Sequence, residues 1–183
     1  MRTERPNVLD FLRLRTQRKH KQAEQRLNIM DENLTRTRYV EILRQFHGFY
    51  SKLNERWQNE KPEIGWVPDF ASKLSLLEKD LFALGEPLPQ KPNQQNLAPL
   101  GLSWWGVLYV SEGSNLGSQM IHKHLQTTMP EWKEALSFYL GQASDTGPRW
   151  MRFLGQLNNA ALAGHEEALS TAAENTFDDV CVS

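Results

Sequence analysis

His20 and Glu24 lie one helical turn apart in a pattern suited to metal ligation. Residues three, four and seven apart share one face of an α-helix. The stripe around His20 therefore consists of Arg13, Thr16, Gln17, His20, Ala23, Glu24 and Leu27. A neutral imidazole binds a metal through one ring nitrogen while the other donates a hydrogen bond, which Glu24 is placed to accept. The alternative is that His20 and Glu24 form an ordinary surface pair on a charged helix.

A second segment, from Tyr109 to Gly117, has glycines at positions 113 and 117 within a helical pattern. Each glycine inside a helix costs about 1 kcal/mol relative to alanine, so another contribution must offset about 2 kcal/mol. Either a second helix packs closely against this pair, or a planar ligand approaches the bare backbone. Ser114 and Asn115 favour a polar, ligand-facing surface, and Tyr109 presents a hydroxyl to the same face as Gly113. Together, the two segments suggest a flat ligand such as a haem held between two helices.

The elements that must position these segments are predicted to be helices, because the hydrophobic periodicity is helical almost throughout. The sequence therefore predicts an all-α protein, a compact multi-helix bundle whose 183 residues form one domain, 1–183. Helices are expected over about Asn7–Asn28, Thr35–Glu60, Asp69–Gly85, Pro99–Thr128 and Glu131–Gly141. Another is expected to start at Asp145–Pro148, and a final short one to reach Asn175. Glu86–Asn96 is predicted to be a loop, and Asp178–Ser183 a frayed end.

Composition limits the classes of function. With 39% hydrophobic and 23% charged residues, and no apolar run near the roughly 20 residues of a membrane span, the chain is expected to be cytoplasmic and free of membrane contact. The one cysteine, Cys181, cannot form an internal disulfide. Basic residues crowd the first 26 positions, which indicates either a solvated helix face or an anchor for an anionic ligand. No recognition motif accompanies them, so no nucleic-acid partner is expected.

These segments resemble the haem oxygenase family, in particular its bacterial members. The match consists of Thr-x-x-x-His-x-x-x-Glu at 16, 20 and 24, the aromatic helix around Phe46-His47-Gly48-Phe49-Tyr50, and Tyr-Val-x-Glu-Gly-Ser-x-Leu-Gly at 109–117. Their order and spacing fit the family from about residue 9 to residue 160. The resemblance implies a compact helical fold in which haem is sandwiched between the first helix and a kinked distal helix.

The resemblance also implies roles for single residues. His20 becomes the iron ligand, and Glu24 becomes its hydrogen-bonding partner. The distal backbone contacts are Gly113 and Gly117. The remaining haem-binding positions are Thr16 of the histidine motif and Arg13 and Tyr109, which fall where the family contacts the haem propionates. Ser114 stands where animal-type members carry an aspartate that organises water, and bacterial relatives share this serine.

The implied activity uses haem as both cofactor and substrate. Electrons from an external donor (ferredoxin, flavodoxin or a reductase) and O2 cleave haem to biliverdin, CO and ferrous iron. Catalytic contributions are expected from Gly113, Ser114 and Gly117, whose close backbone and ordered water would steer the oxygen and supply protons. The alternative is a non-catalytic haem-binding or sequestering protein of the same fold. A thiaminase-like activity would need a nucleophilic cysteine better placed than Cys181, and a di-iron site would need Glu-x-x-His pairs, which the sequence lacks.

Overall fold

The computed structural model describes residues 7–90, 97–141, 145–160 and 162–181. Within these ranges all regular secondary structure is helical, which confirms the predicted all-α class. The α-helices are α1 (Val8–Leu27), α2 (Arg36–Glu60), α3 (Phe70–Ala83), α4 (Trp104–Thr128), α5 (Ser137–Leu140), α6 (Thr146–Asn159) and α7 (Glu166–Val180). Two 3-10 helices, η1 (Gly101–Ser103) and η2 (Pro130–Ala135), flank α4.

Capping residues set the ends of the first helices where the sequence predicted them. The Asn7 side chain accepts a hydrogen bond from the Asp10 amide at 2.9 Å, and Asn28 ends α1 in the left-handed conformation. Thr35 caps α2 in the same way as Asn7 caps α1. Gly85, with φ +71°, follows α3. These helix boundaries agree with the predicted ones to within one or two residues.

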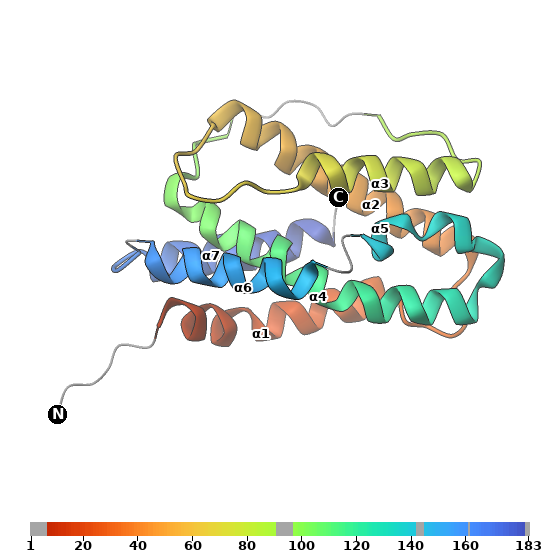
Figure 1. The fold of residues 1–183 in the computed structure, drawn as a ribbon, viewed down its shortest axis with the longest axis horizontal. Coiled ribbons are helices and arrows are strands. Elements are labelled where there is room, and N and C mark those ends of the chain that lie inside the picture. Colours follow the sequence, from red (N-terminus) through yellow and green to blue (C-terminus); the bar gives the residue numbers. More distant parts are fainter. Residues whose placement is uncertain (1–6, 91–96, 142–144, 161, 182–183) are drawn as a thin grey trace.

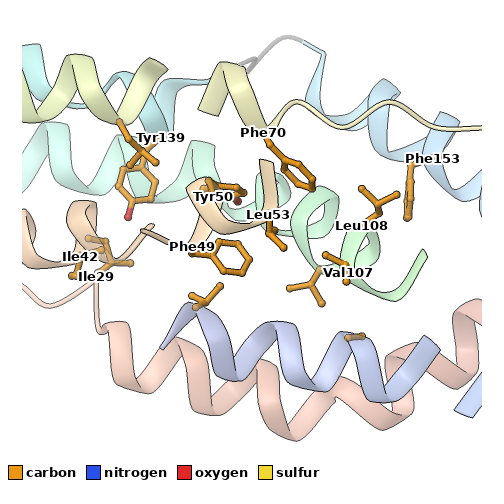
Figure 2. Close-up of a cluster of buried hydrophobic side chains, with 14 of the residues drawn as sticks. Ile29, Ile42, Phe49, Tyr50, Leu53, Phe70, Val107, Leu108, Tyr139 and Phe153 are labelled. Atoms are coloured by element: carbon orange, nitrogen blue, oxygen red, sulfur yellow. The ribbon is translucent and has the colours of Figure 1, made fainter. Parts of the chain in front are cut away.

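Helix α4 runs through the middle of the molecule and packs against α5, α6 and α7, while α2 and α3 form an antiparallel pair on one side (Figure 1). Helices α1 and α7 lie along each other (Figure 1). Gly106 makes the contact between α4 and α7 possible, because a Cβ there would overlap the backbone carbonyl of Leu169. Aromatic and aliphatic side chains from all these helices form the core, part of which is shown in Figure 2.

Two predicted helices begin or continue differently from expectation. The segment 131–141 was expected to form one helix, but it is divided into η2 and α5, with non-helical backbone at Trp132. A buried carboxylate explains why α5 starts at Ser137: Asp80 accepts hydrogen bonds from the amides of Ser137 and Phe138, each at 2.8 Å. The helix expected from Pro99 becomes α-helical only at Trp104, after the 3-10 turn η1.

The prediction of a frayed end from Asp178 is wrong for the described residues. Helix α7 continues to Val180, whose side chain is buried. Lys19 of α1 forms an ion pair with Asp178 at 2.6 Å, so α1 holds this part of α7 in place. Of the predicted 86–96 loop, residues 86–90 are non-helical and 91–96 lie outside the described residues. No described helix is both long and apolar enough to cross a membrane.

Candidate functional site

A cavity of about 500 Å³ lies between α1, α4 and α7, with further walls from α2, α3 and α5. This volume is in the range of ordinary small-molecule sites, about 300–1,000 Å³. Residues that the sequence singled out line it, among them His20, Glu24, Gly113, Ser114 and Gly117. The structure thus brings the histidine segment and the glycine segment, which are far apart in the sequence, to the same cavity.

His20 presents an open imidazole to this cavity. Its side chain is 61% exposed, and its Nε2 lies 3.6 Å from Oε1 of Glu24. This distance exceeds a direct hydrogen bond, so the carboxylate is near enough to engage a ring nitrogen after a small rotation or through water. The ring also packs against Phe177 of α7, with 5.5 Å between ring centroids. The sequence did not point to Phe177, because the last helix was expected to end at Asn175.

Gly113 and Gly117 do not serve close packing between helices. A Cβ at Gly117 would have no described heavy atom within 4 Å, and one at Gly113 would meet only the Trp150 ring at 3.7 Å, an ordinary contact. Gly106 is the position in α4 where a neighbouring helix demands a glycine. Of the two explanations for the glycine pair, the approach of a ligand to bare backbone therefore fits the structure better.

The residue directly before Gly113 is fixed by a buried ion pair. Glu112 is only 1% exposed, and Arg149 of α6 donates to its two carboxylate oxygens at 2.6 and 2.7 Å. The indole of Trp66 donates to the same carboxylate at 2.8 Å. Burial lowers the pKa of Arg149, but the hydrogen bonds and charge of Glu112 outweigh this and raise the pKa above its ordinary value. This bidentate arrangement anchors the glycine segment to α6.

A buried cation on α3 forms another part of the cavity wall. Lys73 is 5% exposed and donates to the Tyr50 hydroxyl at 3.1 Å and to the Ser111 carbonyl at 3.0 Å. The burial of Lys73 could have been predicted from the sequence. Lys73, Leu77 and Leu81 are spaced at four-residue intervals, so they share the apolar stripe of α3 and the lysine is placed among core leucines.

Arg13, Thr16 and Tyr109 come together at the contact between α1 and α4, but they are not among the residues that line the cavity. Burial raises the pKa of the Tyr109 hydroxyl, although a hydrogen bond with Thr16 and the charge of Arg13 act in the opposite direction. Thr16 also donates to the Leu12 carbonyl at 2.7 Å. Haem contacts from these three residues remain predictions.

Two cations of the basic N-terminal segment pair with carboxylates of α7. Lys19 pairs with Asp178, and Arg15 pairs with Glu167 at 2.7 Å, so both cations connect α1 to α7. Arg15 and Glu167 are both largely exposed, so this pair lies on a solvated helix face, whereas Lys19 is partly buried. The two ion pairs also hold the helix that carries His20 against the helix that carries Phe177.

The protein is thus an all-α protein with an exposed histidine and a glycine-bearing helix at one cavity. The chain matches the family model described as Heme oxygenase over residues 7–179. It is 31% identical over 120 residues to a protein named heme oxygenase from Xanthomonas campestris pv. campestris (strain 8004), covering 63% of this chain and 68% of that protein. The chain therefore belongs to the haem oxygenase family.

A solved structure has the same fold. It is the NO- and CO-bound heme oxygenase from Neisseria meningitidis, which is 20% identical in sequence and superposes with a TM-score of 0.73. The superposition covers 96% of this chain and 89% of the Neisseria chain. At this level of identity the likeness supports the fold alone.

Proposed function

We propose that this protein is a haem oxygenase that uses O2 and external electrons to cleave haem to biliverdin, CO and ferrous iron. Family membership supports the reaction class. The observation that carries the proposal is the cavity itself, which has His20 on one wall and the unpacked glycines 113 and 117 on another. We propose that haem lies in this cavity between α1 and α4.

The residues present fit such a ligand. The His20 side chain is 61% exposed and its ring packs against Phe177, so one ring nitrogen could bind iron while the other donates to Glu24. A neutral imidazole ligand gives less electron donation than a thiolate, which suits this chemistry. The flat face of a porphyrin can approach Gly113 and Gly117 because neither position carries a side chain.

Bound haem would supply both the iron that activates oxygen and the ring carbon that is oxidised. The protein's own contribution is positional. Glycines 113 and 117 would let the ring lie close to the α4 backbone, and the Ser114 hydroxyl, which donates to the Ser111 carbonyl at 2.8 Å, would give this wall one polar edge. Arg13, Thr16 and Tyr109 are proposed to meet the propionate edge, which sets the orientation of the ring. An external ferredoxin, flavodoxin or reductase is proposed to supply the electrons.

Optical titration with haemin tests the site. The wild-type protein should bind one haem per chain with a six-coordinate histidine and water spectrum, and His20→Ala should lose or strongly change that spectrum. His165→Ala is the matched control, because His165 is exposed at the start of α7 and does not line the cavity. An unchanged spectrum in His20→Ala would reject His20 as the ligand.

Turnover separates the oxygenase from a haem carrier of the same fold. When the haem complex is incubated with a reductant and O2, the oxygenase should lose its Soret band, release CO and yield a bilin. A carrier would keep the band through the same treatment. Chromatography of the pigment against biliverdin standards then tests the proposed product.

A further inference from the structure

Two buried polar atoms along the cavity lack a hydrogen-bond partner in the described structure. They are Oδ1 of Asp69 and the hydroxyl of Tyr139, and both residues line the cavity. Buried polar atoms in native proteins nearly always have a partner, and ordered water supplies it where side chains do not. These two atoms therefore mark positions on the cavity wall where water would bind.

Asp69 is placed to connect this wall with solvent. It occupies the N-cap position of α3, where an aspartate normally accepts an amide of the first turn, but its side chain makes no such bond. Its Oδ1 instead lies 3.7 Å from Nζ of Lys73. The side chain as a whole keeps 12% exposure although Oδ1 itself is buried. Oδ1 therefore lies in the interior, while another part of the side chain is accessible to solvent.

Lys73 extends the polar connection from Asp69 to the glycine-bearing helix. Its ammonium donates to the Ser111 carbonyl at 3.0 Å, and the Ser114 hydroxyl donates to the same carbonyl at 2.8 Å. Lys73 also donates to Tyr50, which lies in the same buried cluster as Tyr139 (Figure 2). A continuous polar wall thus runs from α3 to Ser114, the position where animal-type relatives carry a water-organising aspartate.

We propose that Asp69 and Lys73 form the proton inlet of the cavity, with Lys73 as a positioning residue and Asp69 as the group that exchanges protons between solvent and cavity water. This inference rests on the proposed haem oxygenase function. In each transfer, an O–H bond of a solvent water or hydronium breaks as the Asp69 carboxylate takes its proton, the carboxyl group turns towards the cavity, and the new O–H bond breaks as the same proton passes to cavity water. The carboxylate is regenerated, and no electron moves.

The charges around Lys73 suit this role. Burial by itself lowers the pKa of the Lys73 ammonium, but Tyr50, Asp69 and Glu112 together raise the pKa above its ordinary value. Lys73 therefore remains a cation at neutral pH. This positive charge lies 3.7 Å from Oδ1 of Asp69, where it would orient the dipoles of cavity water along the wall.

Substitutions at both positions test the inlet. Asp69→Asn keeps the size of the side chain but cannot exchange protons, and Lys73→Met keeps the length and helix propensity but removes the charge. Lys79→Met is the matched control, because Lys79 lies on the same helix and is exposed. Haemin affinity and thermal unfolding should be measured first. The single-turnover rate of haem degradation with reductant and O2 is then measured in H2O and D2O.

We expect Asp69→Asn and Lys73→Met to bind haemin with an affinity within about twofold of wild type. We expect both variants to degrade haem at least about tenfold more slowly, in line with the usual contribution of positioned proton transfer. Their solvent isotope effect should increase, whereas Lys79→Met should behave as wild type. A crystal structure of the wild-type protein should show ordered water bound to Oδ1 of Asp69 and to the Tyr139 hydroxyl.

If folded Asp69→Asn degrades haem at the wild-type rate and with the wild-type isotope effect, the proposed proton inlet is refuted. The proposed oxygenase function would remain. A crystal structure with no water at Oδ1 of Asp69 would also refute the inlet. If Lys73→Met does not fold, Asp69→Asn alone tests the proton inlet, because the Asn side chain is isosteric with that of Asp69. A wild-type haem complex that does not degrade haem would overturn the proposed function, and this inference with it.

Discussion

Substituting Gly117 should separate protein stability from ligand binding. A Cβ at this position would meet no described heavy atom within 4 Å, and the backbone lies inside α4. Gly117→Ala therefore removes the helix cost of glycine without a clash, and should stabilise the haem-free protein by about 1 kcal/mol. For a chain of this size that corresponds to a rise in Tm of about 2–4 °C.

Haem binding should change in the opposite direction. If the bare backbone exists to admit the porphyrin, then Gly117→Leu, which projects a large side chain into the cavity, should weaken haemin binding at least about tenfold, or about 1.4 kcal/mol. Urea unfolding of the haem-free protein and haemin titration measure the two effects independently. Gly106→Ala is the contrasting variant, since its Cβ would overlap the Leu169 backbone and should destabilise the fold by about 1–3 kcal/mol. Wild-type haemin affinity in folded Gly117→Leu would refute this explanation of the glycine pair.

Three further variants follow from the packing. Asp80→Ala should destabilise the protein by about 2 kcal/mol in urea unfolding, because it leaves two amides at the start of α5 without an acceptor. Phe177→Leu should leave overall stability within about 1.5 kcal/mol of wild type, since the swap stays apolar, but should weaken haemin binding by freeing the ring of His20. Glu60→Gln should lose stability at pH 7 and lose none in acid, as thermal melts at both pH values would show.

The pH dependence of the Glu60 variant follows from the sign of its pKa shift. Burial raises the pKa of this carboxyl, but bonds from Arg56, the Leu100 amide and Trp104 outweigh burial and lower the pKa below its ordinary value. A lowered folded pKa means that Glu60 contributes stability above the unfolded pKa of about 4.5, and that the contribution is lost as pH falls through the folded value. Equal destabilisation of the variant at neutral and acid pH would contradict this assignment.

The sequence predicted those features that depend on local signals. Asn7, Asn28 and Thr35 set helix ends through short-range capping, so α1 and the start of α2 could be placed from residue types alone. The histidine and glycine motifs reach the same cavity, as the resemblance implied. What the sequence missed depends on contacts between distant segments. The continuation of α7 to Val180 follows from its packing against α1, and the break before α5 follows from Asp80 on another helix.

Parts of the cavity wall were missed for the same reason. The ion pair of Glu112 was not predicted, because its partner Arg149 lies 37 positions further along the chain. The burial of Lys73 could have been predicted, since Lys73 interrupts an apolar stripe of α3. Its acceptor, the Ser111 carbonyl on α4, depends on how α3 packs against α4 and could not be predicted. Close packing between helices was sought at the glycine pair, whereas the structure places it at Gly106.

A crystal structure of the haem complex would show whether His20 holds haem in the cavity between α1 and α4. We expect a His20 ring nitrogen bonded to iron, Glu24 hydrogen-bonded to the other ring nitrogen, and the opposite porphyrin face against Gly113 and Gly117. Iron bonded to any other side chain, or haem bound outside this cavity, would contradict this expectation.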